Sequence, residues 1–431
     1  MRVVAVSAVL AVTTLTAGGV VAHHAPRISL SRPTVLFSQP VTIRVTRLDK
    51  GEKVTVRDLA TSAGAAPLSS QAMYRANSAG VVDLARSQSE AGTYAGRDRM
   101  GLFWSLQPGT PGPTPLLPDP LPRVETDQLS VEIGGKTVAT RRLVRRLVAP
   151  GVTERQLRPD DVGFYGDLFA PTGGAGRRPA VLVLGGSEGG LAPTSMLIAA
   201  QLASHGYPTL ALAYFGEPGL PSSLMNVPLE YFETALRWLS RQPGVDAHHI
   251  VVSGASRGSE AALLLGVHNP DLVSGVIAAS PSSVVNRGLP DKTQSAWSLG
   301  GSPIAFVPDH EFREPLPADA PDAIIPVELS RGPILFVCGH DDHLWPSCDY
   351  THAMTARLAA ADATPRSTVL RYPAAGHSVG ELVANTPESV TVIPSRYGIY
   401  DLGGSPSADA AARADAWPRL LLFLKHADRR T

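Results

Sequence analysis

Beginning near residue 150, short apolar runs alternate with segments of helical spacing, and few folds accommodate such a pattern. Strands that alternate with helices predict an α/β domain over 150–431, with a mostly parallel sheet covered by helices on both faces. Ligands of such sheets bind at the carboxyl ends of the strands, where functional side chains are therefore expected. The expected strands are 180–184, 209–213, 250–252, 276–279, 334–337 and 369–372, and the expected helices are 196–204, 229–240, 260–265 and 408–425.

The preceding part of the chain follows a different pattern. Residues 41–45 and 54–57 alternate apolar and polar side chains, which is typical of half-buried strands, and turn signals recur between such runs. Repeated short strands without a long helical pattern predict a β-sandwich domain over 26–148. The proline-rich stretch Pro108–Pro122 is predicted to be a loop.

The N-terminal segment is predicted to be a targeting signal that does not belong to the fold. Arg2 precedes an uncharged run that extends to Ala22, and Val20-Val21-Ala22 supplies the residues that a signal peptidase reads. A cleavable signal peptide over 1–22 predicts export, with a mature chain that does not span the membrane. The competing interpretation is an uncleaved membrane anchor, because about 20 uncharged residues can just span a bilayer.

Charge and cysteine content exclude several classes of protein. The chain has 38 Lys+Arg and 38 Asp+Glu residues, and this balance argues against nucleic acid as a partner. Two cysteines form neither a disulfide scaffold nor a four-thiolate zinc site. Cys338 and Cys348 are expected either to form one disulfide or to remain as two buried free thiols, because the sequence does not give their Cα separation.

Two turns share the pattern G-x-S-x-G, and each follows an apolar strand. In Gly254–Gly258 the serine stands between a strand and a helix, which is the setting of a nucleophile elbow. Other strands and helices of the same sheet precede this turn, so Ser256 is predicted to be the nucleophile. Gly185–Gly189 follows the first strongly buried strand, where an oxyanion loop is expected. The backbone amides of Arg257, Ser187 and Glu188 are the predicted oxyanion donors, and a plain surface turn at 185–190 is the alternative.

An acid and a histidine follow at the ends of later strands. The strand 334–337 leads into Asp341 and Asp342, and the strand 369–372 leads to His377. The order Ser256, Asp342, His377 is that of a hydrolase triad, in which the acid orients the imidazole. Asp341 is expected to be more exposed and to cap a helix that begins near Ser347.

Two further features have competing interpretations. The cluster His340-Asp341-Asp342-His343 suggests a metal site, but no further ligand pair has suitable spacing, so no metal is expected. The segment Pro281–Gly332 is long for a connection between two strands and is expected to form part of a substrate pocket or a lid.

With these motifs, the chain resembles the type I acyl-CoA thioesterases and the bile acid-CoA:amino acid N-acyltransferases. The resemblance extends over nearly the whole chain after the N-terminal segment. The stretches that carry it are 92–96, 100–106, 210–215, 228–233, 254–260, 325–328, 339–345, 372–377 and 414–417.

The resemblance implies an α/β-hydrolase domain preceded by an immunoglobulin-like sandwich, with Ser256, Asp342 and His377 as a catalytic triad. It also implies a small-molecule acyl thioester or ester substrate and no cofactor. Acyltransferase members carry cysteine at the elbow, so Ser256 favours hydrolysis. The alternatives are acyl transfer to an amine, an exported carboxylesterase with a substrate other than a CoA thioester, and a binding protein without catalysis.

Overall fold

The computed structural model describes residues 25–109, 117–173, 176–307, 320–361 and 367–427. The predicted signal peptide lies outside these ranges, as do parts of the proline-rich stretch and of the segment 281–332. No helix in the described ranges combines the length and apolar character that crossing a lipid bilayer requires.

The first part of the chain forms two β-sheets around a shared core. Ile43 and Val45 from one sheet and Val56 and Leu129 from the other belong to the same buried cluster. The two-sheet arrangement agrees with the predicted sandwich, whereas its immunoglobulin-like character stays a prediction. The elements are β1 (Arg27–Leu30), β2 (Thr34–Leu36), β3 (Ile43–Thr46), β4 (Lys53–Ser62), β5 (Leu68–Arg75), β6 (Val82–Asp83), β7 (Ala91–Gly92), α1 (Gly101–Trp104), β8 (Gln107–Pro108), β9 (Val124–Ile133) and β10 (Lys136–Arg146).

The second part contains an eight-stranded sheet with the order β11-β12-β14-β13-β16-β17-β20-β21. Its strands from β14 onward are parallel, and β12 is antiparallel to both of its neighbours. The mostly parallel sheet is therefore as predicted, and β11 and β12 were not anticipated. The strands are β11 (Val152–Leu157), β12 (Tyr165–Pro171), β13 (Arg178–Leu184), β14 (Thr209–Ala213), β16 (Val245–Ala255), β17 (Gly275–Ala279), β20 (Ile334–Gly339) and β21 (Thr368–Tyr372).

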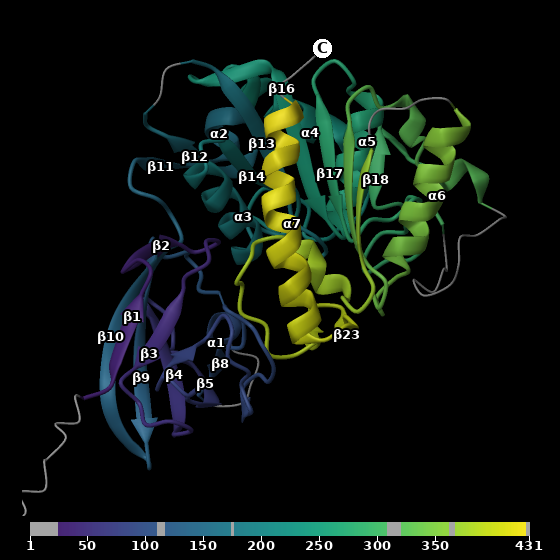
Figure 1. The fold of residues 1–431 in the computed structure, drawn as a ribbon. Helices are drawn as coiled ribbons and strands as arrows, with labels where there is room; N and C mark the ends of the chain where they lie inside the picture. The colour runs from purple at the N-terminus through teal and green to yellow at the C-terminus, as the bar shows by residue number, and fades with distance from the viewer. Residues whose placement is uncertain (1–24, 110–116, 174–175, 308–319, 362–366, 428–431) are drawn as a thin grey trace, which may run out of the picture.

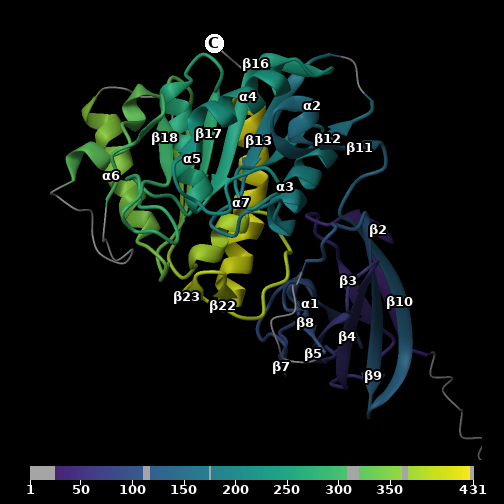
Figure 2. The same cartoon turned by 180° about the vertical axis from the view of Figure 1, so that it is seen from behind.

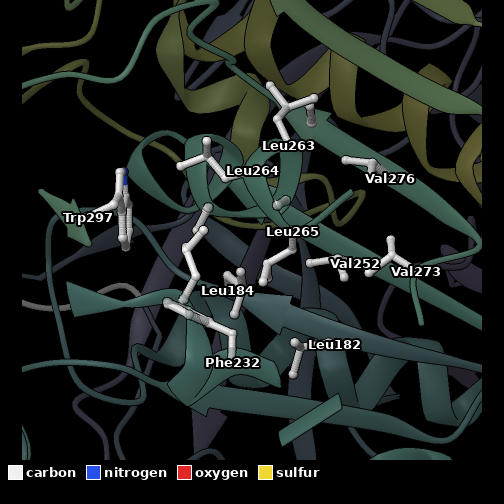
Figure 3. Close-up of a cluster of buried hydrophobic side chains, with 14 of the residues drawn as sticks. Leu182, Leu184, Phe232, Val252, Leu263, Leu264, Leu265, Val273, Val276 and Trp297 are labelled. Carbon is white, nitrogen blue, oxygen red and sulfur yellow. The ribbon is translucent and has the colours of Figure 1, made fainter. Parts of the chain in front are cut away.

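Helices cover both faces of this sheet because alternate residues of its strands point to opposite sides. Leu182 of β13 packs in one core cluster with α4, α5 and α6, and its neighbour Val183 packs in another with α3 and α7. Figure 3 shows the first cluster, and Figures 1 and 2 show the two faces. The helices are α2 (Pro159–Val162), α3 (Pro193–Ser204), α4 (Leu229–Ser240), α5 (Arg257–His268), α6 (Ser347–Ala360) and α7 (Pro406–Ala427).

Short elements lie outside the large sheet. They are β15 (Val227–Pro228), β18 (Trp297–Leu299), β19 (Ser302–Pro303), the hairpin of β22 (Val392–Ser395) and β23 (Gly398–Asp401), and three 3-10 turns at Pro321–Ala323, Val327–Leu329 and His377–Glu381. Along the chain the hairpin follows β21 and precedes α7, and Figure 2 shows it beside the lower end of α7.

The two parts of the chain pack against each other along α3 and α7. Gln201 of α3 accepts a hydrogen bond from the amide of Ser38 at 3.1 Å and donates one to the carbonyl of Leu147 at 2.7 Å. Ala410, near the start of α7, belongs to the core cluster of the first part. Figure 1 shows α7 extending from the large sheet toward α1.

Candidate active site

Ser256 stands at a sharp turn between β16 and α5. Its backbone has φ 54° and ψ −123°, a left-handed conformation that is unfavourable for any residue other than glycine. The amide of Ser256 donates to the carbonyl of Ala279 in β17, at 3.0 Å, and its carbonyl accepts from the Ser259 hydroxyl, at 2.6 Å. These bonds hold the serine at the carboxyl edge of the sheet, as predicted for an elbow.

The glycines on either side of Ser256 are required by close backbone packing. A Cβ on Gly254 would lie 2.0 Å from the carbonyl oxygen of Gly258, within the first turn of α5. A Cβ on Gly258 would lie 2.2 Å from the carbonyl oxygen of Gly185. The first turn of α5 therefore packs directly against the end of β13, which brings the two G-x-S-x-G turns side by side.

Asp342 and His377 are hydrogen-bonded to each other. Nδ1 of His377 lies 2.9 Å from Oδ2 and 3.1 Å from Oδ1 of Asp342, whose side chain is 1% exposed. Oδ1 of Asp342 also accepts the amides of Leu344 at 3.0 Å and Trp345 at 3.2 Å. These backbone donors fix the carboxylate, so the imidazole is oriented by a rigid partner.

The backbone and ring of His377 are fixed from several sides. Its amide donates to Leu402 at 2.7 Å, and its carbonyl accepts from the Ser280 hydroxyl at 2.7 Å. The ring packs edge-on against Trp345, with centroids 5.4 Å apart. Within the described ranges, Nε2 of His377 is buried and has no hydrogen-bond partner. This nitrogen remains available to a reacting group.

Asp341 has a different role from the one predicted. It is more exposed than Asp342, as expected, but the first turn of α6 has no side-chain cap, so the predicted capping contact is wrong. Asp341 instead accepts the amide of Gly404 at 3.2 Å and lies 3.2 Å from Nε2 of His343. The Asp341 carboxylate thus connects the loop after β20, which also carries Asp342, to the segment before α7. Nowhere in the described ranges do three His, Cys, Asp or Glu side chains gather in a metal-binding arrangement.

The turn Gly185–Gly189 lies beside Ser256. A Cβ on Gly186 would lie 3.2 Å from Cβ of Ser256. Tyr214 donates to the carbonyls of Gly185 and Gly186 at 2.6 and 3.0 Å. The side chain of Glu188 folds back onto the turn, where Oε1 accepts the amide of Gly186 at 2.8 Å. Sequence reasoning anticipated a contribution from the Glu188 backbone and missed the contact made by its carboxylate.

The side chain of Arg257 points away from the serine into the core. It forms an ion pair with Glu260 at 3.0 Å and donates to the carbonyl of Arg287 at 2.7 Å. Its amide opens α5, where the first N–H groups have no acceptor inside the helix. The backbone of Arg257 is therefore able to donate to a ligand while its side chain anchors the segment after β17.

A cavity of about 440 Å³ contains Ser256 and His377 in its wall. Apolar side chains from several elements complete it, including Val183, Ile198, Leu344, Leu382 and Ile393. The described residues of 281–332 do not line it, so the expectation that this segment forms part of the pocket is not met there. The β22–β23 hairpin does line it, through Ile393 and Tyr400, and this contribution was not anticipated.

Acidic side chains surround the segment that begins with Gly376 and His377. Oδ1 of Asp409 accepts the amide of Gly376 at 2.6 Å, next to His377. Burial and the nearby charge of Glu388 raise the pKa of Asp409 to about 8, and burial raises the pKa of Glu381 to about 7. Buried Arg413 pairs with Glu388 at 2.7 Å and Glu381 at 3.2 Å, which offsets part of this accumulated negative charge.

A disulfide joins Cys338 of β20 to Cys348 of α6, with a Cα separation of 5.1 Å. Of the two states that the sequence left open, the structure therefore has the bonded one. The bridge closes the loop that carries Asp342, so the acid is fixed at both ends of its loop.

Counted along the chain, the strands of the large sheet lie in the order 1-2-4-3-5-6-7-8. This order, with the second strand antiparallel and a serine elbow after the fifth, defines an α/β-hydrolase. Residues 38–159 match the family described as acyl-CoA thioester hydrolase/BAAT N-terminal region, and residues 227–428 match BAAT/acyl-CoA thioester hydrolase C terminal. The chain belongs to this family of acyl-CoA thioester hydrolases and acyltransferases.

Full-length relatives support the family assignment. The chain is 31% identical to mouse acyl-coenzyme A thioesterase 6 over 406 residues, which cover 90% of this chain and 93% of the relative. It is also 31% identical to the mouse peroxisomal succinyl-coenzyme A thioesterase over 411 residues, with 90% and 94% covered.

Similar solved structures share much less sequence. A dienelactone hydrolase-like promiscuous phosphotriesterase from metagenomic libraries has 18% identity and a TM-score of 0.42, covering 64% of this chain and 99% of its own. A truncated carbohydrate esterase from gut microbiota has 15% identity and a TM-score of 0.43, covering 65% and 99%.

Proposed function

We propose that the protein hydrolyses acyl thioesters through a triad of Ser256, Asp342 and His377. The observation that carries this proposal is the hydrogen bond between His377 and Asp342, 2.9 Å long, beside a strained serine elbow in one cavity. The relatives named as acyl-CoA thioesterases support a thioester as the substrate.

The first half-reaction forms an acyl-enzyme. The hydroxyl oxygen of Ser256 attacks the thioester carbonyl while Nε2 of His377 takes its proton. Asp342 holds the imidazole in the required tautomer and stabilises the imidazolium. The thiolate then leaves and receives the proton from His377. Backbone amides of Arg257 and of the turn Gly185–Gly189 stabilise the oxyanion, and each such donor contributes roughly 3 kcal/mol in known cases.

The second half-reaction releases the acid. Water attacks the acyl-enzyme, again with His377 as the base, and Ser256 recovers its proton. The apolar wall formed by Val183, Ile198, Leu344, Leu382 and Ile393 provides a site for the acyl chain next to the serine. Transfer to an amine would use the same acyl-enzyme with a different acceptor.

A turnover screen tests the substrate class. Acyl-CoA thioesters of graded chain length are compared with simple esters of the same acids, with and without glycine or taurine as an acceptor. We expect free acid and free CoA from the thioesters, with kcat/KM higher than for the matched esters. Acyl-amine products would assign the protein to acyl transfer, and esters as the better substrates would assign it to the carboxylesterases.

We also propose that the protein is exported after cleavage behind Ala22. The uncharged run that ends in Val20-Val21-Ala22 supports this proposal. N-terminal sequencing of protein collected outside the cytoplasm should begin near His23. Recovery of the uncleaved chain from the soluble cytoplasm would refute export, and recovery of the uncleaved chain from membranes would favour the anchor.

A further inference from the structure

The Glu188 side chain places a carboxylate inside the candidate oxyanion site. Oε1 accepts the amide of Gly186 at 2.8 Å. Glu188 lines the same cavity as Ser256 and His377. A carboxylate that accepts a backbone amide of this turn is a bound anion, although here the anion belongs to the protein.

Tyr214 orients the amides of this turn. Its hydroxyl donates to the carbonyls of Gly185 and Gly186. Because a trans peptide is planar, the N–H of the next residue points to the side opposite each carbonyl. The amides of Gly186 and Ser187 are therefore directed away from Tyr214. The Gly186 amide meets Glu188 on that side, so the turn presents its donors to an anion.

The same position adjoins the nucleophile. A methyl group added to Gly186 would lie 2.8 Å from Oε2 of Glu188 and 3.2 Å from Cβ of Ser256. The carboxylate and the serine thus border a single small volume beside Gly186. An oxyanion formed on a carbonyl carbon attacked by Ser256 would have to occupy the amide side of that volume.

We propose that the Glu188 carboxylate occupies the oxyanion site of the resting enzyme and is displaced when the substrate carbonyl binds. This inference depends on the proposed function, because it requires attack by Ser256. Glu188 is a positioning residue here: it keeps the Gly186 amide ordered and the site closed to other anions until an acyl group enters.

The electrostatics of the site support competition between the two anions. A carboxylate and an oxyanion a few ångströms apart repel each other strongly, so both cannot use the same donors. Glu188 is exposed as a residue, but its carboxylate is held at the cavity wall by the Gly186 amide, 2.8 Å away. Removing the charge of Glu188 should therefore favour any ligand that becomes anionic on Ser256.

A straight-chain alkylboronic acid provides the test. The Ser256 oxygen bonds to boron, its proton passes to Nε2 of His377, and the boron becomes a tetrahedral anion that occupies the oxyanion site. The inhibition constant is measured for the full chain and for Glu188→Gln, which keeps an oxygen acceptor for Gly186 but loses the charge. We expect Glu188→Gln to bind the boronic acid at least about tenfold more tightly.

Glu217→Gln is the matched control. Glu217 accepts the amide of Leu191 at 3.2 Å, next to the same turn, but it does not line the cavity. This variant should bind the boronic acid within about twofold of the parent protein. Glu188→Ala also lacks the charge and should likewise bind the boronic acid more tightly. Melting temperatures of both Glu188 variants show whether each is folded, so that an effect of the lost charge is not confused with misfolding.

Three results separate the possible failures. Unchanged or weaker binding by both Glu188 variants, with the parent's melting temperature, would overturn the proposal. An equal gain in Glu217→Gln would also overturn it, because the effect would then reflect net charge alone. If Ser256→Ala bound the boronic acid as tightly as the parent, the proposed function itself would fail, whatever Glu188 does.

Discussion

The two G-x-S-x-G turns have the same pattern and both follow a buried strand, but the chain continues differently after each serine. After Ser256, α5 begins at the next residue, and the serine is left at φ 54° on the edge of the sheet. After Ser187 the chain continues as a loop until α3 begins at Pro193, and Glu188 folds back onto it. The turn that leads directly into a helix holds its serine at a positive φ, whereas Ser187, in the turn that leads into a loop, is not held in this way.

The largest expected difference between the turns is in turnover. Ser256→Ala should lower kcat by on the order of 10⁴-fold or more, because it removes the nucleophile. Ser187→Ala should retain kcat within about fivefold, since the turn contributes amides. Steady-state kinetics with one thioester substrate measures both variants, and circular dichroism verifies that each is folded. The reverse ranking would exchange the roles of the two turns.

A second contrast concerns the adjacent residues Asp341 and Asp342. Asp342→Asn should preserve the packing but disturb the imidazole tautomer, with a kcat loss approaching roughly 10⁴-fold. Asp341→Asn should cost about 1 kcal/mol or less of stability, because its contacts to His343 and Gly404 are exposed. Measuring kcat and melting temperature for both variants separates the roles. A larger kcat loss for Asp341→Asn would show that Asp341, and not Asp342, is the catalytic acid.

The first glycine of each turn offers a test of packing. A Cβ on Gly254 would meet rigid backbone atoms of Gly258 and Ser259, whereas the atoms nearest to a Cβ on Gly185 belong to the side chains of Glu188 and Ser195. Gly254→Ala should therefore lower the free energy of unfolding by about 3 kcal/mol, and Gly185→Ala by less than about 1 kcal/mol. Urea unfolding measures both. Equal losses would mean that the two turns are packed with equal rigidity.

The last expected effect is a dependence of stability on pH that arises from the acidic side chains near His377. The native pKa of Asp409, raised to about 8, exceeds the unfolded value, so the native state binds the extra proton. This contribution is complete below about pH 4 and is lost as the pH rises through 8; Glu381 acts in the same direction with a pKa of about 7. The protein should therefore be less stable at pH 8.5 than at pH 6, which melting temperatures at the two pH values measure.

Asp409→Asn is the check on that assignment. The amide oxygen can still accept the Gly376 N–H, and the side chain no longer titrates. The difference in melting temperature between pH 6 and pH 8.5 should shrink in this variant while kcat at pH 7 changes little. If the melting-temperature difference were the same in Asp409→Asn as in the parent protein, the pH dependence would arise from a group other than Asp409.

Much of the hydrolase part was predictable because its strands are apolar on both sides. The runs 180–184 and 209–213 coincide with β13 and β14 to within two residues. The edge strand β11 was missed because Val152 and Leu157 are its only buried residues, and the polar run between them resembles a loop. The β22–β23 hairpin was missed because its short strands, one of which contains Pro394, lack a clear alternation.

The candidate site also contains features that the sequence predicted and features that it did not. The placement of Ser256, Asp342 and His377 at one edge of the sheet was predictable because each follows a strand that the sequence marks clearly. The contacts made by Asp341 and Glu188 were not predictable, because both depend on where a loop side chain folds in three dimensions. The pairing of Cys338 with Cys348 depends likewise on a Cα separation that spacing along the chain does not give.

Covalent labelling distinguishes the two turns most directly. The full chain is treated with a fluorophosphonate and digested, and the modified residue is located by mass spectrometry. The phosphonyl group should be found on Ser256, should still be found there in Ser187→Ala, and should be absent from Ser256→Ala. Modification of Ser187, or stoichiometric labelling that persists in Ser256→Ala, would contradict the assignment of the nucleophile.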